Sequence, residues 1–300
     1  MRRFLIRSLI YALVLLVIAN VLAFMASYSL RHSAFYKSTF LTHNFTEGEP
    51  FDYIVLGSSR GLTTLDTKQV DSTLNTEGVN LSMDDTDLKS QLLMLRHFYA
   101  SGYSAKVVVL ALDRNNFSKV SDKLGNNDYR FAPFADRDYV HEHYSLYENG
   151  LVKPLTSSRY LPFLSFSYYN LELAIPSLLT AISSDRRNRF DDRGNYTYPV
   201  RKVSKADNRE KAYPERTIDN PLLDEMLSLA DEYGSKTVFY IAPYQYEDYT
   251  LRSGFDDVRI LDHSGKLQAD SLFFDYHHVN SNGRRVATEL FIDDLRGILE

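Results

Sequence analysis

The sequence predicts an α/β fold in which a doubly wound, mostly parallel sheet follows one transmembrane helix. Three observations lead to this prediction. A nearly uninterrupted apolar run occupies residues 8–27. From residue 51 onward, short apolar strands alternate with amphipathic helices, the pattern of an α/β sheet. The clearest strand, residues 106–112, is continuously apolar, which is typical of a parallel strand covered on both faces.

The apolar run has the length of a membrane span. About twenty residues at 1.5 Å each cross the hydrocarbon core, and Arg2, Arg3 and Arg7 precede the run, which predicts a cytoplasmic N-terminus. A cleaved signal peptide is the alternative, but its apolar core would have only about 7–15 residues. We therefore expect an uncleaved single-pass anchor of the inner (cytoplasmic) membrane with an extracytoplasmic, periplasmic domain. Asn20 is expected to be a helix-contact residue or a tolerated polar group.

Composition narrows the function. The first 37 residues hold five basic residues and no acid. The rest of the chain therefore contains 29 of the 34 Lys and Arg residues and all 39 acidic residues, so it is strongly acidic. A domain this acidic is a poor nucleic-acid binder, because such binding relies on neutralising phosphates. The absence of cysteine excludes disulfides, thiolate metal sites and a cysteine nucleophile.

The predicted organisation is an anchor at 1–27, a juxtamembrane connector at 28–50 and an α/β domain at 51–300. The region 115–220, rich in Tyr, Phe, Asn, Asp and Arg, interrupts the alternation and is expected to be an insertion of helices and long loops. Strands are predicted at 53–56, 78–81, 106–112, 236–241 and 257–261, and helices at 64–74, 86–99, 221–233 and 283–299.

Two distant stretches carry candidate catalytic residues. Ser59 follows a buried strand and Gly57, at the sheet edge where ligand sites of such folds lie. Asp275 precedes His278 by three residues, so the carboxylate can orient the imidazole as in a Ser-His-Asp triad. Each signal alone is weak, since strand-Gly-Ser-Ser also occurs wherever a helix needs an N-cap. His277 is expected to be structural.

Together the two stretches resemble motifs of the SGNH (GDSL-like) hydrolases. The similarity is greatest to the membrane-anchored extracytoplasmic branch that acts in D-alanylation of teichoic acids and O-acetylation of exopolysaccharides. It covers residues 50–115 and 220–299. The family's first motif, a strand followed by Gly-x-Ser, is matched by Gly57-Ser58-Ser59, which makes Ser59 the nucleophile by position. Its last motif, Asp-x-x-His-Leu-Asn-x-x-Gly, is matched by Asp275, His278, Asn280 and Gly283, with Val279 in place of leucine.

The oxyanion hole departs from the family pattern. Where the family has a glycine after Asn-Leu, this chain has Ser82, whose backbone N–H is expected to serve instead. Where the family has an asparagine, the nearest residue is Asp113, so Asn115 or Asn116 substitutes or the hole has fewer donors. Arg60 has two interpretations with equal weight: it binds an anionic substrate group, or it pairs with an acid at the sheet edge.

The resemblance implies a serine esterase or acyltransferase that acts on a cell-envelope polysaccharide and needs no metal or organic cofactor. It also implies a multi-pass membrane acyltransferase as a possible partner. Two alternatives stay open: a membrane-proximal esterase or lipase-like hydrolase, and a non-catalytic, membrane-tethered scaffold. His141-Glu142-His143 resembles a metal motif, but two histidines do not define a site without further ligands.

Overall fold

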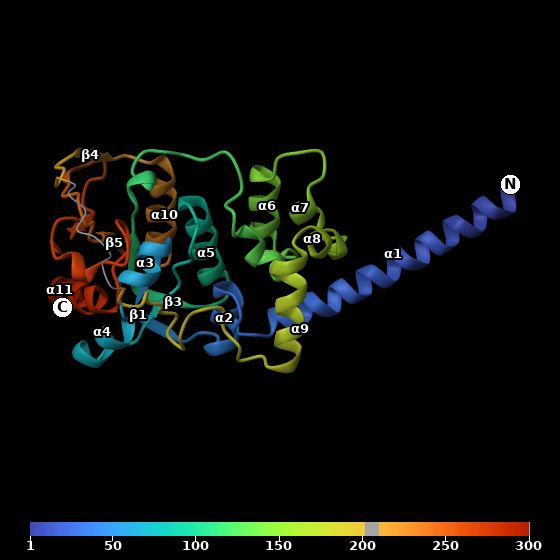
Figure 1. Cartoon of the computed structure of the whole chain (residues 1–300), viewed down its shortest axis with the longest axis horizontal. Coiled ribbons are helices and arrows are strands. Elements are labelled where there is room, and N and C mark those ends of the chain that lie inside the picture. The colour runs from blue at the N-terminus through green and yellow to red at the C-terminus, as the bar shows by residue number, and fades with distance from the viewer. Residues whose placement is uncertain (202–209, 300) are drawn as a thin grey trace. The chain divides into compact units, whose positions relative to one another are not determined.

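The computed structural model describes residues 1–201 and 210–299, which form two compact units that alternate along the sequence (Figure 1). The helical unit comprises Met1–Asn44 and Asp128–Asn188. The α/β unit comprises Phe45–Asn127 and Arg189–Glu300. The predicted insertion at 115–220 is therefore divided between them, because its central part packs with the N-terminal residues in the helical unit.

The α/β unit is built on a five-stranded sheet in which every neighbouring pair is parallel. Its order is β2-β1-β3-β5-β7, the flavodoxin-like arrangement of a doubly wound sheet. The strands are β1 (Pro50–Gly57), β2 (Gly78–Asn80), β3 (Ser104–Ala111), β5 (Lys236–Ile241) and β7 (Arg259–Asp262). The chain changes winding direction between β1 and β3, so the carboxyl ends of these two strands form the switch point where ligands bind in such sheets.

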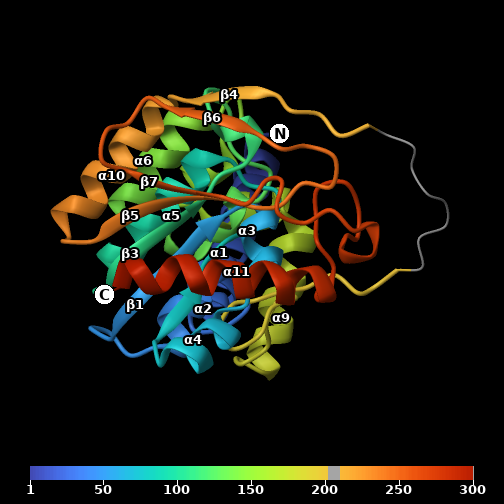
Figure 2. The ribbon, with the colours of Figure 1, turned by 90° about the vertical axis from the view of Figure 1, so that its left-hand side faces the viewer.

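Helices cover both faces of the sheet. Alternate side chains such as Tyr53, Val55 and Val109 form one buried cluster with Phe291 and Leu295 of α11 (Ser281–Leu299). Figure 2 shows α11 lying across this face. The helices α5 (Leu88–Ala100) and α10 (Pro221–Glu232) contact each other and the strands β1 and β5, respectively. The remaining elements of this unit are α3 (Ser59–Thr64), α4 (Thr67–Leu74), η1 (Arg114–Asn116), β4 (Glu215–Ile218), β6 (Thr250–Ser253) and η4 (Asp270–Leu272).

The central strands agree with the sequence prediction to within a few residues, and the predicted helix 64–74 corresponds to α4, which begins three residues later and follows the separate helix α3. Asp66 sets this start, since its side chain accepts a hydrogen bond from the N–H of Lys68 and so caps α4. The predicted connector also contains regular structure: α1 (Arg2–Arg31) continues past residue 28, and α2 (Lys37–Asn44) follows it. Phe40 and Leu41 of α2 are fully buried, so tertiary packing rather than periodicity forms this helix.

The helical unit packs short helices against the C-terminal part of α1. Its other elements are η2 (Asp128–Phe134), α6 (Asp138–Tyr147), α7 (Pro154–Ser157), α8 (Pro162–Tyr168), the π-helical turn η3 (Asn170–Ala174) and α9 (Ile175–Ile182). Of the described helices, α1 is long and apolar enough to cross a membrane.

Candidate active site

The turn after β1 leaves one serine half-buried and uses the other as a helix cap. Ser58 is the N-cap of α3, and its Oγ accepts a hydrogen bond from the N–H of Arg60. Ser59 is therefore the first residue of α3. Gly57 is needed for close approach rather than for an unusual backbone angle, because a Cβ there would lie 2.9 Å from the Cβ of Ala111 on β3. The cap interpretation and the nucleophile interpretation thus apply to different serines.

Ser59, His278 and Asp275 lie in a continuous chain of hydrogen bonds. Ser59 Oγ is 2.8 Å from His278 Nε2. His278 Nδ1 lies 2.9 Å from Asp275 Oδ1 and 3.0 Å from Oδ2. The structure therefore brings together all three predicted residues across 219 positions of sequence. A hydroxyl, an imidazole and a carboxylate in this order can activate the hydroxyl as a nucleophile.

Asp275 is held as an anion. Partial burial raises its pKa, but hydrogen bonds from the His278 ring and the backbone N–H groups of His277 and His278 outweigh this and lower the pKa to about 2. Its Oδ1 accepts both backbone N–H groups at 2.9 Å. The carboxylate therefore fixes the loop and the imidazole together, and it favours the tautomer with hydrogen on Nδ1, which leaves Nε2 to accept the proton of Ser59.

The loop that carries His278 contacts both α11 and Tyr198, a residue far away in the sequence. Asn280 Oδ1 caps α11 by accepting the N–H of Asn282 at 3.0 Å and of Gly283 at 3.1 Å. A Cβ on Gly283 would lie 2.0 Å from the carbonyl oxygen of Leu272, so only glycine fits. The ring of Tyr198 meets the His278 ring edge-on at 5.2 Å. These contacts explain why Asn280 and Gly283 accompany the acid and the histidine in the sequence.

Arg60 lies inside the α/β unit instead of projecting toward a substrate. Its side chain is 5% exposed, and its Nε lies 3.2 Å from Asp113 Oδ1. Its Nη2 donates to the carbonyls of Ala242 and Pro243, just after β5. The guanidinium also stacks on the Tyr244 ring, 3.3 Å from its centroid. Of the two interpretations of Arg60, the structure supports pairing with an acid at the sheet edge.

Asp113 joins the same network. Its Oδ2 accepts a hydrogen bond from Ser58 Oγ, while its Oδ1 faces Arg60. The carboxylate that departs from the family pattern is therefore compensated by a buried cation. We infer that Arg60 and Asp113 are positioning residues, because they tie the serine turn after β1 to the carboxyl ends of β3 and β5.

The backbone N–H of Ser82, the expected oxyanion donor, already donates a hydrogen bond within the protein. The N–H of Ser82 donates to Asn80 Oδ1 at 3.0 Å, and the residue is fully buried. Asn80 Nδ2 in turn donates to the carbonyl of Gly61 in α3. The N–H of Ser59 remains a candidate donor, since N–H groups in the first turn of a helix have no carbonyl partner within it.

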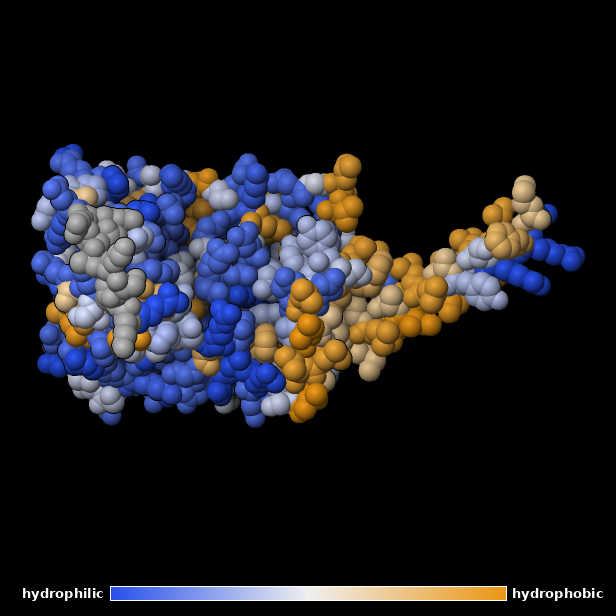
Figure 3. Space-filling model, in the orientation of Figure 1, coloured by the Kyte–Doolittle hydropathy of each residue, from blue (hydrophilic) through white to orange (hydrophobic). Residues whose placement is uncertain are grey.

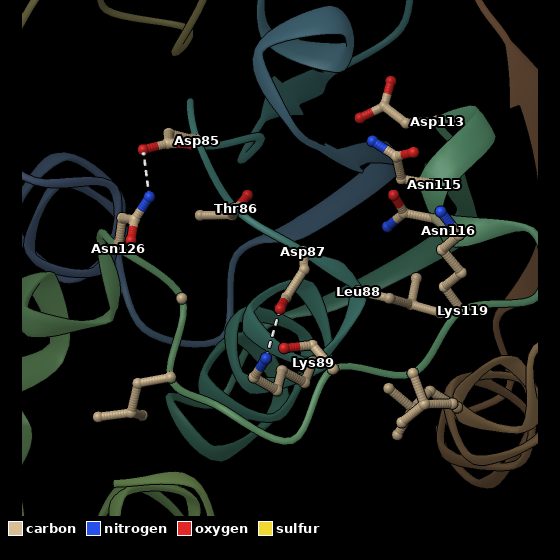
Figure 4. Close-up of a pocket in the computed structure, with 15 residues that line it drawn as sticks. Asp85, Thr86, Asp87, Leu88, Lys89, Asp113, Asn115, Asn116, Lys119 and Asn126 are labelled. Carbon is tan, nitrogen blue, oxygen red and sulfur yellow. Dashed lines mark hydrogen bonds and ion pairs between the residues drawn. The ribbon is translucent and has the colours of Figure 1, made fainter. Parts of the chain in front are cut away.

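Asn115 and Asn116 line a pocket of about 450 Å³ next to the serine turn (Figure 4). Asn115 is exposed, whereas Asn116 is 5% exposed and, among the described residues, its Nδ2 has no hydrogen-bond partner. The pocket includes Asp113 but, of the described residues, not Ser59. Its other polar lining residues are Asp85, Thr86, Asp87, Lys89, Lys119, Ser121 and Asn126.

Two other histidines, His277 and His143, contact aromatic or acidic side chains. The ring of His277 lies edge-on to that of Tyr244 at 6.2 Å, and burial, together with the charges of Arg114 and Arg60, lowers its pKa. In the helical unit, His143 is buried with its Nε2 2.8 Å from Asp128 Oδ2.

Sequence reasoning missed Asn80, Tyr198 and Tyr244. Asn80 was adjacent to a predicted donor, so its short polar side chain at a strand end was an available signal. Tyr198 and Tyr244 had no such signal, since each acts by a contact that only the fold creates.

Comparison of the chain with protein-family models and with curated proteins finds no match.

Proposed function

We propose that this chain is a serine acyl-ester hydrolase or acyltransferase of the SGNH type that acts on a cell-envelope polysaccharide. The observation that carries the proposal is the hydrogen-bonded series from Ser59 through His278 to Asp275. Its position at the switch point of a parallel sheet supports it, because ligands of such folds bind there.

In the proposed reaction, Ser59 Oγ attacks the acyl carbonyl while His278 Nε2 removes its proton. The imidazolium is stabilised by Asp275 and then gives the proton to the leaving alcohol, which departs with the electrons of the ester bond. A water or a polysaccharide hydroxyl attacks the acyl-enzyme in the second half, with His278 again acting as the base. The Ser59 N–H and Asn116 Nδ2 are the proposed oxyanion donors.

The pocket beside Asp113 offers hydrogen-bonding groups that suit a polyhydroxylated acceptor. Carboxylates, amides, hydroxyls and lysines line it and match sugar hydroxyls as donors and acceptors. Leu88, Val120, Leu124 and Leu222 line it too, so a membrane-proximal esterase or lipase-like hydrolase stays as the alternative to an enzyme acting on polysaccharide.

We also propose that α1 anchors the chain in the inner membrane, with a cytoplasmic N-terminus and the α/β unit outside. The length and apolar character of α1 and the three preceding or adjoining arginines support this orientation. A multi-pass membrane acyltransferase would be a chemically suitable acyl donor.

One observation favours a non-catalytic scaffold as the second candidate. Because the Ser82 N–H is taken by Asn80, the oxyanion site offers fewer donors, and one missing donor typically costs about 10²–10³ in rate. A scaffold predicts that Ser59→Ala leaves the cellular envelope modification unchanged.

Ester turnover by the full-length protein tests the proposal. Release of p-nitrophenol from p-nitrophenyl acetate and of acetate from an O-acetylated polysaccharide is measured, with mass spectrometry of an unacetylated polysaccharide to detect transfer. We expect Ser59→Ala to reduce turnover by at least about 10³-fold. The control is Ser72→Ala, an exposed serine on α4, which should retain full turnover. Equal turnover of the two folded variants would refute the proposal.

A further inference from the structure

The segment of α1 in which every residue is exposed is too short to cross a bilayer by itself. Every residue from Phe4 to Ile18 is exposed, whereas burial against the helical unit begins at Ala19. Fifteen residues at 1.5 Å each give about 22 Å, against a hydrocarbon core of about 30 Å. At least about 8 Å of the core must therefore be crossed where α1 already packs against its own unit.

The helix α9, which packs against α1, buries polar side chains and exposes large apolar ones, the reverse of a helix in a water-soluble protein. In α9, Ser177 and Thr180 are each 4% exposed, whereas Leu178 is 68% and Ile182 is 87% exposed. The buried side holds hydrogen bonds to α1, because Ser29 Oγ lies 3.0 Å from Thr180 Oγ1 and donates to the Ser177 carbonyl at 3.0 Å. Small polar contacts inside and large apolar side chains outside are typical of helices packed in lipid.

Further exposed apolar residues lie on the elements beside α1, since α8, η3 and α9 each contact it. Figure 1 shows α9 running crosswise to α1, and Figure 3 shows apolar residues over α9 and beside α1. We call this surface the apolar face, made up of Leu151, Val152, Tyr168, Leu171, Leu178 and Ile182.

We infer that the apolar face is a membrane-docking surface that sits in the outer leaflet, with α9 lying in the plane of the bilayer. The contacts of α8, η3 and α9 with α1 identify lipid as the occupant, since elements packed on the anchor would meet the same bilayer. Tyr168 supports an interfacial depth, because tyrosine collects at the headgroup level, and so does the exposed Glu172 beside Leu171. The inference rests on the proposed anchoring but not on the proposed reaction.

Lipid quenching of a fluorophore tests it in the full chain, which contains no cysteine. Leu178→Cys is labelled with bimane and reconstituted into phosphatidylcholine–phosphatidylglycerol vesicles that hold doxyl groups on the upper acyl chains. Leu13→Cys, inside the proposed span, is the positive control. Tyr213→Cys is the matched negative control, since Tyr213 lies in the α/β unit and is also 68% exposed.

We expect loss of fluorescence at Leu178→Cys and Leu13→Cys but not at Tyr213→Cys. Fluorescence at Leu178→Cys as strong as at Tyr213→Cys, with Leu13→Cys quenched, would overturn the docking surface and leave the anchor standing. An unquenched Leu13→Cys would overturn the anchor and the inference together. Protection of Leu178→Cys from aqueous iodide without doxyl quenching would show that a second copy, not lipid, covers the face, and would also overturn the inference.

Discussion

Asp275→Asn is the substitution that most specifically tests how the imidazole is oriented. In the structure, Asp275 Oδ1 accepts the N–H groups of His277 and His278. An asparagine keeps these bonds through its own Oδ1, which places its NH₂ group at the position of Oδ2, 3.0 Å from His278 Nδ1. Asp275 offers Nδ1 two acceptor oxygens, at 2.9 and 3.0 Å, whereas the amide NH₂ repels a hydrogen on Nδ1. The substitution therefore favours the tautomer with its hydrogen on Nε2, which can no longer accept the proton of Ser59.

We expect this variant to fold normally and to lose about 10⁴ in kcat, which corresponds to about 5 kcal/mol of transition-state stabilisation. Turnover of p-nitrophenyl acetate measures the loss, urea unfolding checks stability, and ¹⁵N NMR of the ring reports the tautomer. The matched control is Asp270→Asn, a nearby carboxylate that accepts from Gln245 Nε2 and should keep full activity. A folded Asp275→Asn variant with turnover within tenfold of the parent protein would refute the reasoning.

The same contacts make a prediction for pH. Because the pKa of Asp275 is lowered to about 2, this carboxylate stays ionised over the whole range in which the protein is assayed. This carboxyl should therefore add no second protonation to the acidic limb of the rate profile, whose slope in log rate against pH should not exceed one. A slope of two would show that the carboxyl also takes up a proton and would contradict this account.

Two further predictions concern stability. Arg60→Ala leaves Asp113 largely buried without its cation, so the free energy of unfolding in urea should fall by about 3–5 kcal/mol, whereas Arg114→Ala, which removes a more exposed pair, should cost less than about 1 kcal/mol. Equal losses would contradict the role given to Arg60. Burial raises the pKa of Asp71, beside Tyr53, to about 6. The folded state then holds the proton more tightly than the unfolded state, so stability falls as pH rises from about 4 to 6. Asp71→Asn removes this loss and should stabilise the protein by about 1 kcal/mol above pH 6, less than the roughly 3 kcal/mol such a pKa change represents, because water screens the partly exposed carboxyl. No gain at pH 7, or the same gain at pH 3, would refute it.

The sequence was sufficient to predict the central strands and the three residues that the structure joins in one hydrogen-bonded series, for physical reasons. Buried parallel strands must be continuously apolar, so 106–112 and 236–241 were recognisable without the fold. The acid and the histidine share one loop, and the serine follows a strand, so their types and spacing were local signals. Arg60, in contrast, is defined by carbonyls 182 and 183 positions away, which no local pattern encodes.

The helical unit was the least predictable part for a related reason. Apart from α1, its helices are short, and α9 turns large apolar residues outward, whereas such residues usually belong to a core. The interruption of strand–helix alternation after residue 115 came before the second segment of this unit, which begins at Asp128. Its association with α1 depends on contacts such as that between Ser29 and Thr180, which only the structure reveals.

Labelling with a fluorophosphonate tests the central claim most directly, because the probe reacts with a serine that a base has activated. The full-length protein is compared with Ser59→Ala and with Ser58→Ala, in which the cap and the bond to Asp113 are lost but the proposed nucleophile remains. We predict labelling of the parent protein and of Ser58→Ala, and none of Ser59→Ala. Labelling that persists in Ser59→Ala, or is absent from the folded parent protein, would contradict the account.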